Sequence, residues 1–156
     1  RIKIARGFSF VAIAPPYSVQ TEDARLAMPS EVPIETAVWQ MGRVVAVTNA
    51  LATGNAGLLS TACVDKLHEP YRKKLIPDYD ALREAARMAR ASAFVISGSG
   101  AAMIAICESP IVAQAVMNNA RDVRDDLWIQ ILEPSLAGTS ITCDDNTIHH
   151  NTFDEI

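Results

Sequence analysis

Two features of this chain could hold an anion: a glycine-rich turn, and arginines set beside prolines. The turn is Ser97-Gly98-Ser99-Gly100, with an apolar run on either side. Glycine has no Cβ and tolerates positive φ, so such a turn can bring bare backbone N–H groups against a phosphate or carboxylate. The same residues could equally form a plain β-turn that binds nothing, and their types alone leave both interpretations open.

Two arginines could complete an anion site. Arg25 follows Thr21 in Thr-Glu-Asp-Ala-Arg, and Arg72 ends the segment His68-Glu69-Pro70-Tyr71-Arg72. Two guanidinium groups that converge on one carboxylate or phosphate bind it through paired, charge-assisted hydrogen bonds. The alternative for each is a solvated or ion-paired surface arginine. A loop rich in proline, histidine and tyrosine favours the functional interpretation for Arg72.

The glycine turn does not fit a dinucleotide-binding fingerprint. That pattern needs Gly-x-Gly-x-x-Gly before a helix, and here Met103 stands at the third glycine position. The segment between the turn and Pro110 is also too short for a crossover helix. We therefore expect a β-hairpin, with strands at 94–97 and 103–107 around the turn.

Other catalytic or metal-binding patterns are missing from the sequence, which contains neither Gly-x-Ser-x-Gly nor His-Glu-x-x-His. His149-His150 has no third ligand nearby, so we interpret the pair as part of an exposed tail. Cys63, Cys107 and Cys143 lie far apart and form no Cys-x-x-Cys motif. We expect all three to behave as buried small apolar residues in a reducing compartment.

The elements that must position these residues follow an α+β pattern. Helices are expected at 22–27, 34–53, 56–67, 78–90 and 110–123, with strands at 8–14, 94–97, 103–107, 127–132 and a short one near 139–143. Thr21 is the expected N-cap of the first helix. Helices should pack on one face of a small antiparallel sheet. Residues 1–143 should form one domain, and the polar stretch 144–156 an irregular tail.

The helix at 34–53 carries the strongest signal. Pro33 stands at its start, Gly54 follows its end, and apolar residues recur at helical spacing between them. This apolar stripe comprises Ile34, Ala37, Val38, Met41, Val45, Thr48 and Ala52, widened by Val44, Val47 and Leu51. We expect this helix to be well buried.

The overall composition narrows the classes of partner. The chain has 156 residues and a formal net charge of −4, which argues against nucleic acid as a partner. No apolar run approaches the roughly 20 residues that span a bilayer. The sequence shows no signal peptide, and it begins at Arg1 without a methionine, so we expect a piece of a longer protein.

Three segments, in this order, resemble the homoserine kinase family of the GHMP small-molecule kinase superfamily. They are Thr21-Glu22-Asp23-Ala24-Arg25 with Pro29, then Leu67-His68-Glu69-Pro70-Tyr71-Arg72 with Leu75-Ile76-Pro77, then Ser97-Gly98-Ser99-Gly100-Ala101. The glycine element alone would mark only the superfamily, whereas the other two are more specific. The resemblance extends from about residue 8 to 132 and covers the family's C-terminal lobe, which is ferredoxin-like.

The resemblance implies ATP-dependent phosphorylation of the homoserine hydroxyl, in the cytoplasm, on the route to threonine. Arg25 and Arg72 would clamp the homoserine carboxylate, with Thr21 near the same site. Ser97, Gly98, Ser99 and Gly100 would form the loop that shapes the active site, although Ala101 stands where many members have proline. ATP and Mg²⁺ would bind mainly to the N-terminal lobe, so this chain should hold no catalytic residue or metal ligand and should be inactive alone.

Three alternatives remain open at this point. The chain could be a lobe of another GHMP kinase, such as a mevalonate-type enzyme. It could be a non-enzymatic α+β binding or regulatory module in which the glycine turn holds no ligand. It could also be a dimerisation domain, since a long apolar helix and strand edges can support a homodimer.

Overall fold

The computed structural model describes residues 4–134, 140–143 and 146–149. Four strands form an antiparallel sheet in the order β2-β3-β1-β4: β1 (Ser9–Ala14), β2 (Ala93–Ile96), β3 (Met103–Cys107) and β4 (Trp128–Leu132). Each expected strand of this sheet is present, and the hairpin around the glycine turn is confirmed, with Ile96 opposite Met103. Beyond the sheet, β5 (Ser140–Cys143) pairs with β6 (Asn146–His149).

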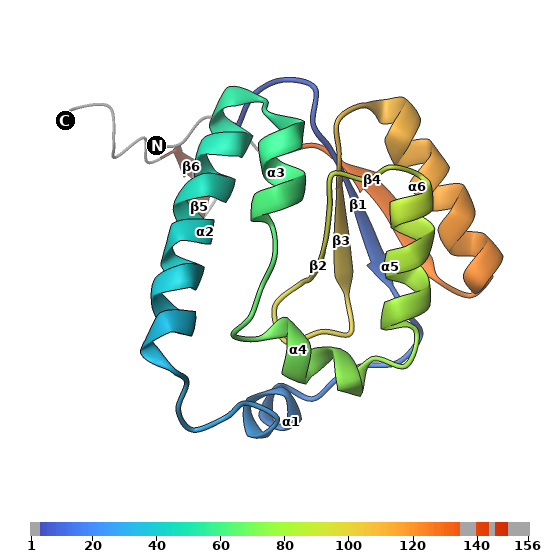
Figure 1. The fold of residues 1–156 in the computed structure, drawn as a ribbon. Helices are drawn as coiled ribbons and strands as arrows, with labels where there is room; N and C mark the ends of the chain where they lie inside the picture. The colour runs from blue at the N-terminus through green and yellow to red at the C-terminus, as the bar shows by residue number, and fades with distance from the viewer. Residues whose placement is uncertain (1–3, 135–139, 144–145, 150–156) are drawn as a thin grey trace.

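The helices surround the sheet on two sides (Figure 1). They are α1 (Thr21–Leu26), α2 (Ile34–Thr53), α3 (Ala56–Ala62), α4 (Glu69–Arg72), η1 (Lys73–Leu75), α5 (Tyr79–Met88) and α6 (Pro110–Val123). The α+β architecture with an antiparallel sheet and packed helices is therefore confirmed.

The main core lies between the sheet and helices α5 and α6. The alternation of side chains along the strands sends Val11 and Ile13 of β1 to this face, where Leu82 of α5 and Val116 of α6 are also fully buried. A smaller core lies on the other face of the sheet, where Leu59 of α3 and Ala50 of α2 pack against strand residues. Helices therefore lie on both faces of the sheet, which corrects the expectation that they pack on one face: α5 and α6 cover one face, and α2 and α3 cover part of the other.

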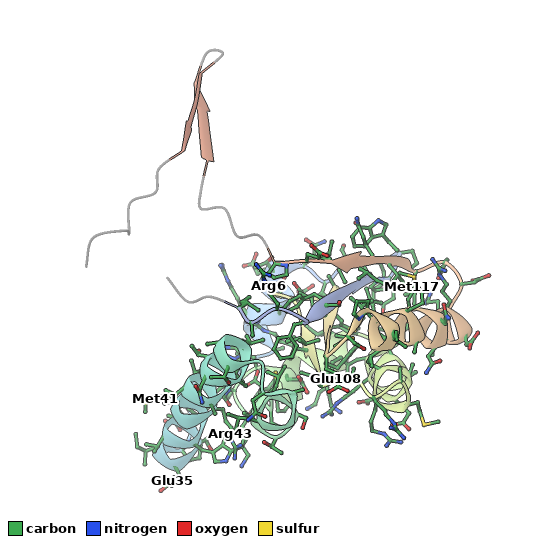
Figure 2. All side chains as sticks on the ribbon, turned by 90° about the horizontal axis from the view of Figure 1, so that it is seen from above. Arg6, Glu35, Met41, Arg43, Glu108 and Met117 are labelled. Carbon is green, nitrogen blue, oxygen red and sulfur yellow. The ribbon has the colours of Figure 1, made fainter. Side chains whose placement is uncertain are left out.

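The expectation that α2 is well buried is wrong. Its bounds are as expected, and Gly54 ends it in the left-handed conformation with φ +76°. However, Ile34, Val38, Met41, Val44 and Val45 are 56–70% exposed. The face that packs is the opposite one, where Ala50 is fully buried beside Val47 and Leu51. Figure 2 shows α2 at the edge of the molecule, with Met41 on its outer side.

Other differences are local. Thr21 is the first residue of α1 and not its N-cap: that position is Gln20, whose side chain makes no capping hydrogen bond. Ala24, fully buried, anchors this short helix instead. The helix expected to reach residue 67 ends at Ala62, because Asp65 beyond it binds backbone N–H groups of the following turn.

The expected loop at 68–77 contains α4 and η1, and strand β6 lies within the stretch expected to be irregular. Thr147 and Ile148 in β6 are β-branched and favour strand structure. His149 ends that strand, whereas His150 lies outside the described residues. Of the cysteines, Cys107 is buried as expected and Cys63 is only half-buried.

Candidate functional site

A cavity of about 240 Å³ lies where α4 faces the β2–β3 turn. Its lining residues are Asp65, His68, Glu69, Arg72, Val95, Ile96 and Gly98. Two acidic side chains, a histidine and an arginine thus surround a floor of two aliphatic residues from β2. A cavity with charged groups of both signs at its rim and an apolar floor suits a small polar molecule.

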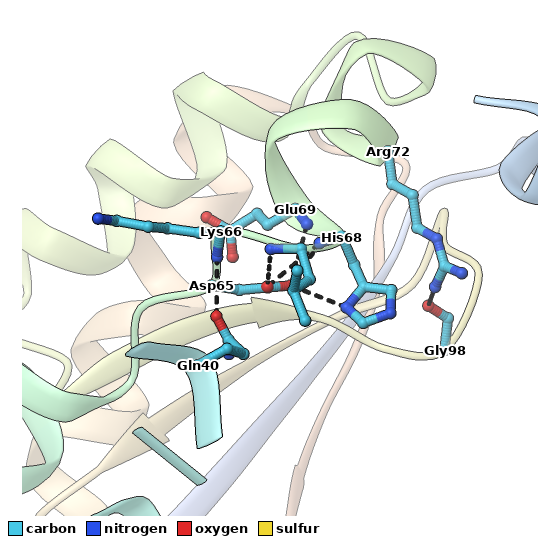
Figure 3. Close-up of polar contacts among 8 residues, drawn as sticks. Gln40, Asp65, Lys66, His68, Glu69, Arg72 and Gly98 are labelled. Atoms are coloured by element: carbon cyan, nitrogen blue, oxygen red, sulfur yellow. Dashed lines mark hydrogen bonds and ion pairs between the residues drawn. The ribbon is translucent and has the colours of Figure 1, made fainter. Parts of the chain in front are cut away.

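Arg72 joins the two motifs that could handle an anion. Its Nη1 donates to the carbonyl oxygen of Gly98 at 2.9 Å, across 26 residues of sequence (Figure 3). Its Nε is buried and has no hydrogen-bond partner among the described residues. Because a guanidinium has five N–H donors, this bond uses one donor and leaves others for a ligand.

The glycine turn contributes the carbonyl oxygen of Gly98 to the site. Gly98 has φ +61° and Gly100 has φ +94°, conformations that glycine adopts at low cost. Within the turn, Gly100 N–H donates to Ser97 at 3.1 Å and Ser97 N–H donates to Ala102 at 2.8 Å. These bonds close the hairpin and aim the Gly98 carbonyl at Arg72.

Asp65 organises the turn that leads into α4. Its carboxylate accepts backbone N–H bonds from Leu67 at 2.6 Å, His68 at 3.1 Å and Glu69 at 3.0 Å. The same carboxylate lies 3.4 Å from Nδ1 of His68, as Figure 3 shows. A negatively charged oxygen that binds several backbone donors makes strong, short hydrogen bonds.

Helix α2 holds this turn from the other side. Gln40 of α2 accepts the N–H of Lys66 at 3.0 Å. Trp39 packs against two cations, with Lys66 Nζ at 4.2 Å and Arg43 Cζ at 4.5 Å from its ring centre. Cation–π contacts of this kind are worth about 0.5–1 kcal/mol each at exposed sites.

Buried side chains support the site from below. Ile76, which follows η1, is 2% exposed and lies against the glycine turn, close to Gly100. Tyr79 is fully buried, its ring 5.7 Å from that of Phe94. Burial, followed by the nearby Glu69 carboxylate, raises the pKa of the Tyr79 hydroxyl above its usual value. That hydroxyl therefore stays protonated at ordinary pH.

The structure brings some of the expected site residues together and not others. Arg72 and Gly98 meet, with Ser97, Ser99 and Gly100 in the same turn. Thr21 and Arg25 are exposed on α1 and do not line this cavity. Whether Arg25 converges with Arg72 on one ligand therefore remains an expectation.

Asp65 and Gln40 were not anticipated from the sequence. Asp65 could have been found, since an aspartate just before a short Pro-containing helix commonly accepts N–H bonds from the next turn. Gln40 could not, because its contact depends on how α2 packs beside a segment 26 residues away.

The fold and the site together define the class of the protein. Residues 48–125 match the family model described as GHMP kinases C terminal, so the chain belongs to the GHMP kinase C-terminal family. The matched range contains α4, Arg72 and the whole glycine turn.

Within that family the chain is similar to homoserine kinases. It is 41% identical over 110 residues to homoserine kinase of Prochlorococcus marinus strain MIT 9515, covering 69% of this chain and 35% of the relative. It is 35% identical over 136 residues to homoserine kinase of Caldicellulosiruptor bescii, covering 85% and 44%. The chain thus spans less than half the length of these relatives.

Solved structures agree with this similarity. The homoserine kinase structure from Cytophaga hutchinsonii has a TM-score of 0.79 and 28% identity, over 85% of this chain and 42% of that one. A phosphomevalonate kinase structure from Streptococcus pneumoniae has a TM-score of 0.67 at 14% identity, which shows a shared fold only.

Two searches of the described residues gave negative results. No helix there combines the length and apolar character that crossing a membrane requires. In the same residues, no three His, Cys, Asp or Glu side chains gather closely enough to hold a metal ion.

Proposed function

We propose that this chain is the C-terminal lobe of an ATP-dependent homoserine kinase, which transfers the γ-phosphoryl group to the homoserine hydroxyl in threonine biosynthesis. The observation that carries the proposal is the contact between Arg72 and the Gly98 carbonyl, made inside a cavity of suitable polarity. Similarity to homoserine kinases along most of the chain supports this acceptor over others.

In this proposal the carboxylate of homoserine binds the unused donors of Arg72, and the aliphatic part of the substrate lies over Val95 and Ile96. Arg25 and Thr21 of α1 join the same substrate from the opposite side. Holding the acceptor by its carboxylate fixes its hydroxyl relative to the phosphoryl donor, which is the main contribution to catalysis that positioning groups make.

ATP and Mg²⁺ are expected to bind mainly to the part of the kinase that lies outside this chain. The turn 97–100 fits a supporting role beside the nucleotide, because Gly98 lines the cavity while hydrogen bonds within the turn keep it rigid. Homoserine and ATP would be the small-molecule partners, with a cytoplasmic location and no nucleic-acid or membrane partner.

Substitution of Arg72 in the full-length kinase tests the proposal. Arg72→Ala removes the carboxylate clamp, so KM for homoserine should rise roughly ten- to a hundredfold, while KM for ATP stays within about twofold. Steady-state kinetics with each substrate varied in turn gives both constants. Lys74→Ala is the matched control, since Lys74 is an exposed cation two residues away that does not line the cavity.

Equal increases in both KM values would contradict the role assigned to Arg72. A full-length enzyme that phosphorylates mevalonate or another alcohol, and not homoserine, would place the chain in a different GHMP kinase. Tight amino-acid binding without any phosphoryl transfer would favour a non-enzymatic module.

A further inference from the structure

We propose that Asp65 is the positioning residue of this site: its carboxylate builds the turn that carries Arg72 to the Gly98 carbonyl. The inference rests on the proposed function of the chain, because it assigns Asp65 an effect on homoserine binding. Asp65 itself need not touch the substrate.

Helix α4 depends on contacts outside itself for its stability. Four residues are too few for a stable helix, because nucleation costs more than a single turn of hydrogen bonds returns. The N-cap residue, His68, makes no side-chain capping bond. The three free N–H groups at this end bind Asp65 instead, at 2.6–3.1 Å. The Asp65 carboxylate, which lies outside the helix, therefore supplies the hydrogen-bond acceptors that the N-terminus of α4 lacks.

The Asp65 carboxylate is connected to Arg72 through the backbone of His68. His68, whose N–H binds Asp65, accepts the N–H of Arg72 at its own carbonyl, at 3.0 Å. The backbone of Arg72 is thus one residue removed from the group that Asp65 holds. A change in the direction of the His68 peptide would turn Arg72 away from the cavity.

The Arg72 side chain has little freedom to compensate for a displacement of α4. Its Nη1 reaches Gly98 at 2.9 Å, and its Nε is enclosed. The acceptor is fixed by the tight turn at 97–100. A displaced α4 would therefore break the bond to Gly98, and the guanidinium would lose its orientation toward a carboxylate.

The surrounding structure should survive the loss of Asp65. The segment before α4 is still tied to α2 through Lys66 and Gln40, and the segment after it is anchored by buried Ile76. The side chain of Asp65 is itself 25% exposed. Its removal should disturb the position of Arg72 more than it disturbs the fold.

The test uses three variants of the full-length kinase. Asp65→Ala removes all the acceptors, and KM for homoserine should rise roughly tenfold with KM for ATP within about twofold. Asp65→Asn keeps one oxygen to accept the N–H groups of Leu67 and His68, but its NH2 group is a donor where Oδ2 accepted the N–H of Glu69, so it should restore only part of the affinity. Asp80→Ala is the matched control, because Asp80 of α5 is a more exposed aspartate that pairs with Lys73 of η1. It should behave as wild type.

A crystal structure of Asp65→Ala gives a second readout that does not depend on activity, and the bond from Arg72 to Gly98 should be broken. The inference is overturned if that bond persists, or if KM for homoserine is unchanged in Asp65→Ala. It is also overturned if both KM values rise together with a lower melting temperature, which indicates a merely structural role. A wild-type kinase that does not use homoserine would overturn the proposed function, while the crystal structure would still decide the positioning role.

Discussion

Gly100 shows how closely a single residue limits the geometry of the site. A Cβ at this position would lie 2.9 Å from Cδ1 of Ile76 and 3.6 Å from Cγ2 of Ile96. Its φ of +94° is unfavourable for any residue with a side chain. Gly98, by contrast, has φ +61° and open space around it. Gly100 is therefore required by both its backbone conformation and the lack of space beside Ile76, and Gly98 by its backbone conformation alone.

We predict that Gly100→Ala lowers the free energy of unfolding by about 2–3 kcal/mol, because backbone strain and a clash in the core add together. Gly98→Ala should cost only about 1 kcal/mol, the price of a left-handed backbone alone. Urea unfolding of the two variants and the wild type measures both. Equal losses would show that the contact with Ile76 relaxes freely.

Cys107 should make stability depend on pH in the alkaline range. Burial raises the pKa of the Cys107 thiol from its usual value of 9.0 to about 11. Above pH 9 the unfolded chain loses this proton and the folded chain keeps it, so ionisation favours the unfolded state. The stabilising contribution is complete below pH 9 and is lost as pH rises toward 11.

The loss is about 2 kcal/mol at pH 10.5 and approaches about 3 kcal/mol above pH 11, since each unit of pKa shift is worth about 1.4 kcal/mol. Urea unfolding at pH 8 and pH 10.5 should show a larger decrease for wild type than for Cys107→Ala. The buried tyrosine hydroxyl of Tyr79 titrates in the same direction and is common to both proteins. Identical decreases in the two proteins would mean that Cys107 is solvated in the folded state.

At the scale of elements, the sequence predicted what local signals determine. Pro33 and Gly54 bound α2 because proline at a helix start and glycine after its end are favoured by the backbone itself. The hairpin at 94–107 follows from two apolar runs around a glycine turn. Residue type and spacing also singled out Arg72 and the turn, which the structure shows in contact with each other.

The sequence could not predict features that depend on distant contacts. Helix α4 was missed because four residues have no detectable periodicity and their stability comes from Asp65. Periodicity also showed that α2 has an apolar stripe, but it could not show that a second apolar face, at Val47 and Ala50, would be the one to pack. Thr21 has the residue type of an N-cap, but the helix begins one residue earlier than a cap at that position requires.

The exposed stripe of α2 leads to a prediction about assembly. Its five large apolar residues extend over about 17 Å of helix and include no charged side chain. Two copies can pair antiparallel through this stripe around Met41 without bringing like charges together. We propose that the 156-residue chain forms a homodimer through α2, as large exposed apolar patches commonly mark interfaces.

Sedimentation of this chain at increasing concentration should show dimers. Val38→Lys combined with Val45→Lys should shift the chain to monomers with a nearly unchanged melting temperature, because both side chains are exposed. Ile111→Gln is the matched control, since Ile111 is an exposed apolar residue on α6, away from the stripe. A wild-type chain that stays monomeric at high concentration would contradict this arrangement.

At the scale of the whole molecule, the proposed function makes this chain one wall of an active site. The chain supplies Arg72, Gly98 and an apolar floor to the lining of a cavity of about 240 Å³. Homoserine kinases that it resembles are more than twice as long as the segment they share with it. Phosphoryl transfer needs the acceptor, the nucleotide and its metal ion held in line, and charge neutralised at the transferred group.

We therefore predict that the 156-residue chain alone does not turn over ATP with homoserine. In the proposed function the side chains of this chain orient only the acceptor, and orientation of one reactant alone leaves the reaction bimolecular and slow. A coupled assay for ADP, with the full-length kinase as the positive control, measures the rate. Homoserine titrated into the isolated chain should bind weakly, because the proposed carboxylate site at Arg72 is already present. Binding should be weaker still after Arg72→Ala. Homoserine-dependent ADP formation by the isolated chain would show that one lobe holds the complete catalytic site.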